Sequence, residues 1–598
     1  MQSEKNEQPE SGVAKPIESL TNSFPVRLWP GFVILILVLA AWTIPPLVAP
    51  RTFISFISLM TAPELGTLAA ILWWTLAARV HGRSRWLVPV LAFVPIIPVA
   101  LIFHESKERV FIIFLGQITA LAVWVTWLAF TAVLSMKIRE IGLSAALICL
   151  WIISTLIRID GAGSDSMPQI RWCWQLSDEE KSLAARKGIS DSTNIIKKEI
   201  KISRGDWPGF RGERRDGLAI GTKIDPDWKS HPPELIWKNR VGPGWGSFAV
   251  VAGKLFTQEQ LGAEEAIVCY DATTGEEIWE YKDSVRFDES ISGAGPRATP
   301  TIDGEKLYAR GATGKLYCLQ AKTGTLNWSA DIVALGGAIP QWGFADSPLV
   351  FDNRVFVYAG GGSDKGVMAL NADNGELVWS AGNAKHGYSS VHLAKIANVS
   401  QVLLVSDYGV ESFSPNDGKK LWESNWQTAG NRSTQPIIFP NDEVIIGTGI
   451  GSDQGLKKLR IIKTGEQWQV ESIWFSRGAK PYFNDGVVIN NHYYGFDGNR
   501  FCCVDLADGS QKWKESTYGY GQVIGLEDQN LLIVQAENGQ IALVEAKPSE
   551  FSELAKINAL TGKTWNHPVV VHNYLYLRNG QEAICFKLHS PSNMTRNP

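Results

Sequence analysis

The chain has 598 residues, with 57 Lys and Arg against 60 Asp and Glu, so its formal net charge is −3 at pH 7. This balance gives no reason to expect nucleic acid as the main partner, because that role needs a basic face. The charges are unevenly placed: residues 28–157 hold five long stretches almost free of them, and an ordinary polar and apolar mixture follows from about Gly205. This division excludes a single soluble globular domain, a disordered chain and a protein made only of membrane spans.

The five apolar stretches predict helices that span a membrane. Each is about long enough to cross the ~30 Å hydrocarbon core of a bilayer, and a helix satisfies all its backbone polar groups internally. The stretches are residues 28–50, 52–78, 86–103, 110–136 and 141–157. We therefore expect an all-α transmembrane domain of about five helices over residues 28–158, preceded by a cytoplasmic tail of residues 1–27.

The short loops between the stretches predict the orientation, because Lys and Arg gather on the cytoplasmic side. With the N-terminus inside, eight Lys and Arg residues lie on the cytoplasmic side, and three lie opposite: Arg51, Lys107 and Arg109. Five spans then place the rest of the chain outside. We expect a multi-pass protein of the inner (cytoplasmic) membrane with an extracytoplasmic, periplasmic soluble domain.

Two capping signals occur around these segments. The sequence Thr61-Ala-Pro-Glu64 has capping-box spacing, which predicts a helix that starts near Pro63 and leaves Glu64 at the membrane interface. Residues 159–204 form an expected polar connector, in which Ser177-Asp-Glu-Glu180 predicts the start of one short helix.

A repeat occupies the second half of the chain. An apolar strand, a turn ending in Gly, three further residues and a Trp recur, with tryptophans at positions 237, 279, 328, 379, 422, 474 and 513. A second marker, the opening strand of each unit, recurs every 42–48 residues from Pro300 onward, and a unit near Phe248 brings the total to eight. This period fits one four-stranded blade per unit. Residues 205–590 are therefore predicted to form an all-β, eight-bladed propeller, followed by a tail of residues 591–598.

The residue types of the repeat have physical reasons. A hairpin turn needs a residue that tolerates positive φ, hence the glycines at positions 275, 324, 375, 418 and 509. A tryptophan at a fixed place on the outer strand can wedge between blades and donate its indole N–H to a carbonyl. The last unit, which ends in QEAICFKL, lacks an outer strand of its own. We expect residues 234–237 (ELIW) to supply it and close the ring.

This Gly-and-Trp repeat resembles the pyrroloquinoline-quinone (PQQ)-like repeat of the quinoprotein alcohol dehydrogenase-like propellers. The stretches DWPGFRGERRDG (206–217), GPGWGSFAVVAGKLFTQEQ (242–260) and GPRATPTIDG (295–304) are similar to those of membrane-anchored bacterial proteins with a PQQ-binding-like beta-propeller repeat. The resemblance covers about residues 205–588 and implies the fold. It does not fix an activity, because similar repeats occur in non-enzymatic propellers of the outer-membrane assembly machinery.

The dehydrogenases among these relatives imply a cofactor. They use PQQ with a central Ca²⁺ held by a Glu, an Asn and an Asp, together with a catalytic Asp and often a disulfide between adjacent cysteines. Cys502 and Cys503 are adjacent here, but they lie in a strand just before a Gly turn. We expect them to be two alternating strand side chains, and no metal site is predicted from the sequence.

The phase of the repeat nominates a site, because residues just before each innermost strand crowd the propeller axis. The nominated residues are Trp245, Arg297, Asp346, Tyr388, Lys480 and His567. Asp346 is the candidate catalytic base or metal ligand, and Arg297 with Lys480 could hold an anion or the quinone carboxylates. The alternative is that groups at these positions bond to one another and to water in an inert channel.

Two functions remain open from the sequence. The first is a binding or scaffold module, anchored in the membrane, that recruits a protein or a small polar ligand at the propeller funnel. The second is a dehydrogenase dependent on PQQ and Ca²⁺ that oxidises an alcohol or sugar and passes electrons to membrane quinone. The absence of a mapped Ca²⁺ triad favours the first, and the five-span anchor favours the second.

Overall fold

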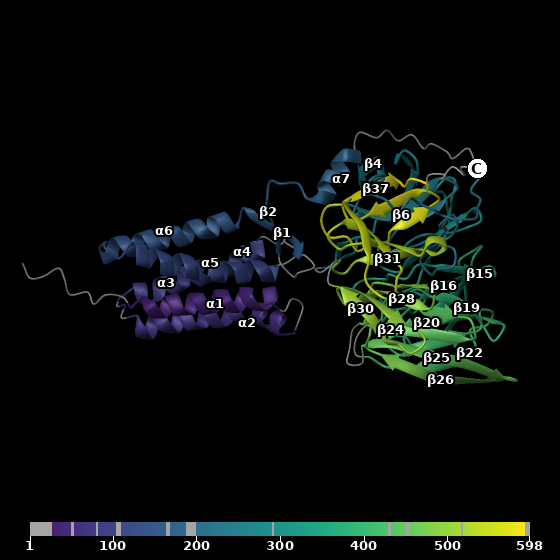
Figure 1. The fold of residues 1–598 in the computed structure, drawn as a ribbon. Coiled ribbons are helices and arrows are strands. Elements are labelled where there is room, and N and C mark those ends of the chain that lie inside the picture. The colour runs from purple at the N-terminus through teal and green to yellow at the C-terminus, as the bar shows by residue number, and fades with distance from the viewer. Residues whose placement is uncertain are drawn as a thin grey trace, which may run out of the picture. The chain divides into compact units, whose positions relative to one another are not determined.

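The structure is a computed structural model, and it falls into two compact units, Met1–Gln175 and Leu176–Pro598 (Figure 1). The predicted tails, residues 1–27 and 591–598, lie outside the described residues except for Arg27 and Pro591. The described residues are 27–48, 53–78, 80, 82–102, 109–162, 168–186, 199–289, 292–428, 432–449, 454–515 and 518–591.

The first unit is helical, as predicted, but its helices differ in number from the apolar stretches. The elements are α1 (Trp29–Val48), α2 (Phe53–Leu72) continuing into the π-helical turn η1 (Trp73–Ala77), α3 (Ser84–Phe93), α4 (Ile96–Ile102), α5 (Arg109–Phe130), α6 (Met136–Ser154) and the hairpin β1 (Ile157–Ala162) with β2 (Pro168–Trp172). Three described helical segments are long and apolar enough to cross a membrane: Trp29–Val48, Ile57–Ala77 and Ile113–Phe130. Five crossings are not confirmed and stay a prediction.

The third apolar stretch is divided into α3 and α4 because it contains Pro95. A proline has no backbone N–H, so Pro95 cannot donate to the carbonyl of Leu91 one turn earlier. The indole Nε1 of Trp151 in α6 donates to that carbonyl instead, at 2.9 Å. A side chain from a neighbouring helix thus satisfies the polar group that the break exposes.

The predicted capping box at Thr61 was wrong. Helix α2 runs without interruption through Pro63, so Glu64 lies inside the helix rather than at its start. The amide Nε2 of Gln117 in α5 donates to Glu64 Oε1 at 3.2 Å, which gives the carboxylate a partner within the bundle. Trp74 and Trp124 pack edge to face at 5.0 Å in the core of the unit, so these aromatics serve packing.

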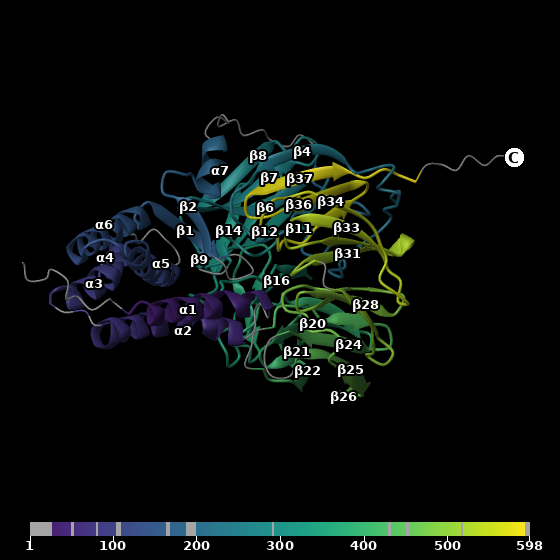
Figure 2. The same ribbon diagram turned by 60° about the vertical axis from the view of Figure 1, so that its left-hand side comes forward.

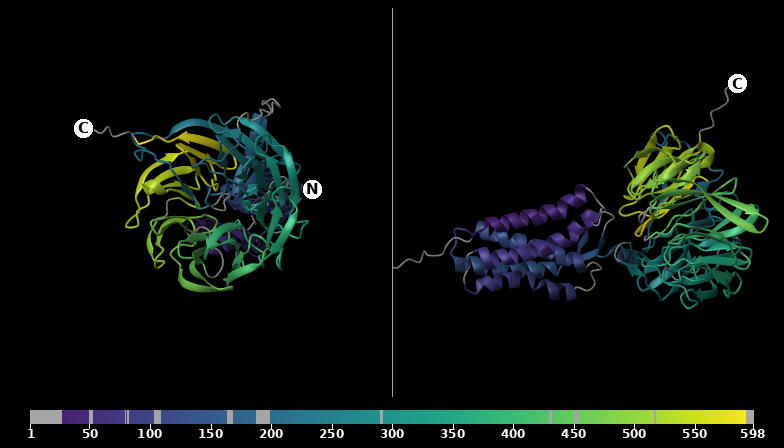
Figure 3. Two further views of the ribbon diagram at one scale, coloured as in Figure 1. Left: turned by 90° about the vertical axis from the view of Figure 1, so that its right-hand side faces the viewer. Right: turned by 90° about the horizontal axis from the view of Figure 1, so that it is seen from below.

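The second unit contains eight sheets around a central axis, which confirms the predicted eight-bladed propeller of four-stranded blades (Figure 3, left). The first four blades are β5–β8 (Ala249–Val251, Lys254–Leu261, Glu264–Asp271, Glu277–Asp283), β11–β14 (Thr301–Asp303, Lys306–Arg310, Lys315–Gln320, Leu326–Asp331), β15–β18 (Leu349–Phe351, Arg354–Tyr358, Val367–Asn371, Leu377–Ala381) and β19–β22 (His392–Ile396, Val399–Ser406, Gly409–Phe413, Lys420–Asn425).

The next three blades continue this order, with the first strand of each innermost. They are β23–β26 (Ile437–Phe439, Glu443–Thr448, Gly455–Thr464, Gln467–Ser476), β27–β30 (Val487–Ile489, His492–Asp497, Arg500–Asp505, Gln511–Glu515) and β31–β34 (Gln522–Leu526, Leu531–Gln535, Gln540–Glu545, Glu553–Asn558, with the short helix η2 at Glu527–Gln529). A short strand β3 (Leu218–Ala219) adds in parallel to β31 of blade 7, and β9 (Asp288–Glu289) pairs with β10 (Gly293–Ala294) between blades 1 and 2.

Blade 8 closes the ring as predicted. It consists of β35 (Val569–Val571), β36 (Tyr574–Arg578) and β37 (Glu582–Lys587), with β4 (Glu234–Arg240) as its outer strand. β4 lies antiparallel to β37, with Trp237 opposite Cys585 (Figure 2). The strand from the N-terminal side covers the edge that blade 8 would otherwise expose.

The repeated tryptophans bind consecutive blades together. In five blades the indole Nε1 donates to a backbone carbonyl of the next blade, at 2.9–3.2 Å: Trp237 to Ala272, Trp279 to Ala321, Trp328 to Ala372, Trp379 to Pro415 and Trp513 to Lys547. Trp422 instead donates to the side-chain amide oxygen of Gln401. Trp474 Nε1 has no hydrogen-bond partner among the described residues. The predicted carbonyl partner is therefore confirmed for most of the ring.

The turn glycines have a second reason that the sequence did not indicate. Gly324 has the expected positive φ, 72°. It also lies flat against the indole of the preceding blade, because a Cβ at this position would come within 2.5 Å of Trp279. Gly275, Gly375 and Gly418 stand in the same relation to the preceding tryptophan.

We predict that Gly324→Ala destabilises the propeller more than Gly465→Ala does. Both glycines have positive φ, so each alanine costs about 1–2 kcal/mol in backbone strain. Only Gly324 adds a clash with an indole, which costs about 1–3 kcal/mol more, since the space around Gly465 is open. Urea unfolding of the detergent-solubilised chain measures both changes, and equal losses would contradict the packing role.

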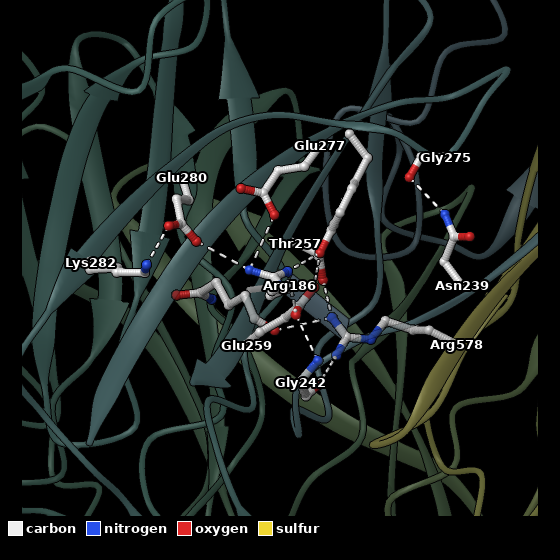
Figure 4. Close-up of polar contacts among 12 residues, drawn as sticks. Arg186, Asn239, Gly242, Thr257, Glu259, Gly275, Glu277, Glu280, Lys282 and Arg578 are labelled. Atoms are coloured by element: carbon white, nitrogen blue, oxygen red, sulfur yellow. Dashed lines mark hydrogen bonds and ion pairs between the residues drawn. The ribbon is translucent and has the colours of Figure 1, made fainter. Parts of the chain in front are cut away.

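A helix of the connector, α7 (Asp178–Arg186), belongs to the propeller unit. Its capping box forms as predicted: Glu180 N donates to Ser177 Oγ, and Ser177 N donates to Glu180 Oε2. At its C-terminal end, Arg186 makes ion pairs with Glu259, Glu277 and Glu280 of blade 1, at 3.0, 3.2 and 3.1 Å (Figure 4). Helix α7 is thereby held against blade 1.

Candidate functional site at the propeller axis

A closed ring of hydrogen bonds surrounds the axis. It uses polar residues next to the start of each innermost strand, which lie beside the six nominated positions rather than at them. The bonds between successive blades are Ser247 N to Thr299 Oγ1, Thr299 N to Ser347 Oγ, Ser347 N to Ser390 Oγ, Ser389 Oγ to Thr434 O, Gln435 N to Asp485 Oδ1, Asn484 Nδ2 to Gly521 O, Gln522 Nε2 to Trp565 O and Asn566 Nδ2 to Gly246 O, all 2.7–3.0 Å. Every blade junction therefore has its own bond, which gives these positions a structural role.

Asp346 lies within this ring and is fully buried. Its Oδ2 accepts from Tyr358 N at 2.9 Å and is 3.4 Å from Arg310 Nη1, and Arg310 is itself fully buried. Burial raises the pKa of Asp346, and the charge of Arg310 opposes that rise. The carboxylate is thus engaged with an arginine, and its nomination as a catalytic base stays a prediction.

Seven aromatic side chains from six blades form a chain of ring contacts at the mouth of the axis. In each of these blades the aromatic residue precedes the residues of the hydrogen-bonded ring in the sequence. We call these seven side chains the aromatic collar. In order of contact they are Trp245, Trp565, Phe483, Tyr520, Tyr482, Trp342 and Tyr388, with neighbouring ring centroids 5.0–6.4 Å apart. All but Tyr388 are partly exposed. Two predicted residues, Trp245 and Tyr388, therefore belong to one continuous aromatic surface.

Charged groups lie among these rings. Arg297 Nε donates to the carbonyl of Trp342 at 2.9 Å, so the guanidinium of this nominated residue lies beside the collar. Burial lowers the pKa of Arg297 to about 10. Lys563, which was not predicted, lies with its Nζ 4.5 Å from the ring centroid of Trp565, and burial lowers its pKa to about 8. Glu537 accepts from Trp565 Nε1 at 2.8 Å, so acidic and basic groups both reach the mouth.

Glu265, at the start of β7, gives this region a measurable dependence on pH. Burial raises its pKa to about 7, and the backbone N–H of Ala312 only partly opposes that rise. The pKa of Glu265 is higher in the folded chain than in the unfolded chain, so the folded chain keeps this proton to a higher pH. The contribution of Glu265 to the free energy of unfolding is therefore fully present below about pH 4.5 and is lost as the pH rises through 7. We predict that Glu265→Gln removes this loss and stabilises the chain by about 3 kcal/mol at pH 8, with little effect at pH 4.5. Urea unfolding at both values measures it, and equal effects at the two would contradict it.

Lys480 lies elsewhere because the predicted opening of its blade was wrong. The sequence placed that opening at Pro481, but the innermost strand β27 begins at Val487. Lys480 Nζ instead pairs with Asp497 at 2.8 Å. Asp485, two residues before β27, takes the axial position, where its Oδ1 accepts from Gln435 N. The stretch between Pro481 and β27 supplies Tyr482 and Phe483 to the collar.

His567 is near the axis as predicted, but it is mostly enclosed. Its ring packs edge to face against Phe210 at 5.0 Å, and its carbonyl accepts from Ser247 Oγ at 2.6 Å. Burial lowers the pKa of the imidazole well below its ordinary value, so the ring is neutral at physiological pH.

Residues 206–217, which we call the plug, contact five of the eight propeller blades. Trp207 bridges to Val250 of blade 1, and Ile302 N of blade 2 donates to Pro208 O at 2.7 Å. Arg215 Nη2 donates to Ser347 O before blade 3, and Arg211 Nη2 donates to Gly486 O before blade 6. The chain then joins blade 7 through β3. The sequence indicated this stretch only by its resemblance to relatives.

The side chains present do not fit the Ca²⁺ and disulfide of the quinoprotein dehydrogenases. Cys502 and Cys503 are free and belong to core clusters on opposite faces of blade 6, which confirms that they are alternating strand side chains. Within the described ranges no group of three or more His, Cys, Asp or Glu side chains could hold a metal ion. The collar with Arg297 and Lys563 could instead accommodate a flat ligand or a peptide side chain.

Comparison with known proteins gives two groups of relatives: outer membrane protein assembly factors and quinoprotein alcohol dehydrogenases. The chain is 24% identical over 372 residues to the outer membrane protein assembly factor BamB of Shewanella oneidensis, which covers 59% of this chain and 88% of that protein. It is 28% identical over 197 residues to the quinoprotein alcohol dehydrogenase PedH of Pseudomonas putida, covering 31% of this chain and 30% of that protein. The crystal structure of BamB from Moraxella catarrhalis matches with a TM-score of 0.43 and 14% identity, over 60% of this chain and all of that one.

A family match covers most of the propeller. The family described as outer membrane protein assembly factor BamB matches residues 263–515 and 406–598, which together make up more than half of the chain. These residues include blades 2 to 7 and strands β35, β36 and β37 of blade 8. The outer strand of blade 8, β4, lies before the matched range. The chain therefore belongs to this family of PQQ-like repeat propellers.

Proposed function

We propose that this protein is a membrane-anchored, extracytoplasmic scaffold whose aromatic collar binds an extended segment of a protein partner. The observation that carries the proposal is the collar itself: its seven aromatic side chains come from loops of six different blades, and six of the seven are partly exposed. Aromatic side chains bury large areas at little entropic cost and dominate the binding energy of protein interfaces.

The layers beneath the collar support binding rather than chemistry. The axial polar groups are engaged in blade-to-blade hydrogen bonds, and Asp346 is engaged with Arg310. The match to the outer membrane protein assembly factor of Shewanella oneidensis covers 88% of that protein, whereas the match to the dehydrogenase PedH covers 30% of that protein. We infer a partner that takes part in assembly at the cell envelope.

A photo-crosslinker in place of Tyr482 tests the proposal in growing cells. We expect a discrete adduct with one protein from this position and none from Val378, which is exposed on the outer strand β18, away from the collar. Adding Trp565→Ala should remove the adduct, because Trp565 and Tyr482 both contact the ring of Phe483. Equal crosslinking from Tyr482 and Val378 would contradict a collar site, and so would an adduct that Trp565→Ala leaves unchanged.

The anchoring part of the proposal rests on the helical unit. Large apolar side chains cover its outside, including Ile36, Leu47, Leu65 and Leu76, as in a lipid-facing surface. We propose an inner-membrane location with the N-terminus in the cytoplasm and the propeller in the periplasm.

Cys173 offers a native probe of this topology, because it is exposed and directly follows strand β2, after the last helix of the first unit, whereas the five cysteines of the propeller are buried. We predict that a charged, membrane-impermeant maleimide labels the chain in cells with a permeabilised outer membrane and an intact inner membrane, and that Cys173→Ser abolishes the label. Labelling that requires lysis of the inner membrane would contradict the proposed orientation.

The dehydrogenase remains the second candidate, because the collar and two neighbouring cations suit a flat, carboxylate-bearing cofactor. PQQ would supply the redox chemistry, and Arg297 and Lys563 would hold its carboxylates. Purified protein incubated with PQQ and Ca²⁺ tests this candidate through dye-linked oxidation of alcohols and sugars. Saturable turnover that Arg297→Gln abolishes would replace the scaffold proposal.

A further inference from the structure

A second hollow lies on the other side of the hydrogen-bonded ring from the collar. It has a volume of about 510 Å³, within the range of small-molecule sites. In each of the six blades that contribute to the collar, the collar residue comes first in the sequence, the ring residue next and the innermost strand last. This cavity is lined by innermost-strand residues, among them Leu393, Ile437 and Val488, and by the plug. It is therefore separate from the site of the proposed function.

Three buried side chains in its lining have nitrogen atoms without a partner. Arg211, Arg215 and His392 are 4%, 8% and 6% exposed. Arg211 Nε and Nη1, Arg215 Nε and His392 Nδ1 have no hydrogen-bond partner within the described part of the chain. Buried donors are nearly always paired in folded proteins, because an unpaired one loses its hydration without replacement. Their shared position indicates an acceptor that binds from the cavity.

The charges around these nitrogens leave an excess of positive charge. Arg211 Nη1 faces Asp485 at 4.0 Å, while Arg215 and Arg310 share the single carboxylate of Asp346. Three guanidinium groups therefore stand against two carboxylates. His392 is neutral, because burial and the two nearby arginines lower its pKa to about 3.

The rim of the cavity adds no net charge. Arg214 and Lys395 balance Asp216 and Glu527, and Arg214 makes an ion pair with each of these two carboxylates, at 2.8 and 3.1 Å. The unbalanced positive charge thus lies at the inner end, where solvent screens it least. Burial also lowers the pKa of Arg215 to about 10, as expected for a cation that lacks a full counter-charge.

The rest of the wall is apolar. Proline, isoleucine and phenylalanine of the β23 segment, residues 436–440, line it together with Leu393 and Val488. We propose that this cavity binds a small amphiphilic acid, with a carboxylate or phosphate head at Arg211, Arg215 and His392 and an apolar body against β23. A guanidinium group suits either head, because its fork of N–H donors matches the paired oxygens.

Calorimetric titration of the full chain in nanodiscs tests this proposal with three probes of similar size: benzoate, phenyl phosphate and the neutral benzamide. We expect saturable binding of at least one of the two acids and none of benzamide. The stronger acid identifies the head group. Arg211→Gln should weaken that binding by at least about tenfold, since it removes a charge-assisted contact.

Because Arg211 also holds the plug through Gly486 O, a second variant separates binding from folding. His392→Phe removes an unpartnered nitrogen and should weaken acid binding while the melting temperature stays the same or rises. Trp342→Ala, in the collar, should leave acid binding unchanged even if it abolishes partner binding.

Three results would overturn the proposal. The first is that neither acid binds, and the second is that benzamide binds as tightly as benzoate. The third is unchanged affinity in folded Arg211→Gln and His392→Phe variants.

Discussion

Replacing Arg186 with methionine should lower the free energy of unfolding of the propeller unit by about 3–5 kcal/mol, the range measured when one partner of a buried ion pair is removed. Glu259 is fully buried, and its Oε2 lies 3.0 Å from Arg186 Nη2. Without the guanidinium group, Glu259 would face Glu277 and Glu280 with no cation from the connector between them. Urea unfolding followed by tryptophan fluorescence measures the loss.

A control on the same helix isolates this effect. Lys181 pairs with Asp178 at 2.9 Å near the surface, so Lys181→Met should change stability little. The double variant Arg186→Met/Glu259→Gln should recover part of the loss, because it removes the uncompensated carboxylate. If Arg186→Met were as mild as Lys181→Met, the connector would not be held in the way that Figure 4 suggests.

Asp346→Ala should also destabilise the propeller by about 3–5 kcal/mol, because it leaves the fully buried guanidinium of Arg310 without its carboxylate. It also removes the acceptor for Tyr358 N. The loss should appear in urea unfolding whether or not any ligand is present.

The matched double variant tests the cause. Arg310→Met/Asp346→Leu replaces the buried pair with apolar groups and should be clearly more stable than Asp346→Ala alone. Asp373→Ala, which breaks an exposed pair with Lys306, should leave stability unchanged. An Asp346→Ala variant of normal stability would refute the structural role and restore this residue as a candidate base.

The features that depend on local pattern could be predicted from the sequence. The period of tryptophans and glycines gave the eight blades, and the missing outer strand of the last unit gave the closure by residues 234–237. The indole of Trp279 donates to the expected carbonyl, that of Ala321, because the repeat fixes the positions of both the tryptophan and the turn of the next blade. Pattern alone failed in blade 6, where the five residues between Pro481 and β27 shifted the phase and misplaced Lys480.

The features that depend on distant residues could not be predicted. The contacts of Arg186 with Glu259 and of Arg211 with Gly486 join parts of the chain with no periodic relation to each other. The collar was predicted only in part, because Trp342 and Trp565 precede their strands by different distances and therefore share no repeat position. These long-range contacts depend on two features: the closed ring of blades and the path of the plug. The sequence predicts the ring of blades but does not predict the path of the plug.

The shared construction of blade 8 affects how the protein is made. β4 is synthesised before the other three strands of its blade, β35, β36 and β37, and its partner β37 is the last strand in the described part of the chain. Until then, the growing chain carries an unpaired N-terminal strand and an open sheet edge, both prone to pairing with other chains. A premature stop anywhere before β37 would therefore yield a product liable to aggregate rather than a shorter ring. Chaperones or the translocation machinery would have to shield β4 throughout synthesis.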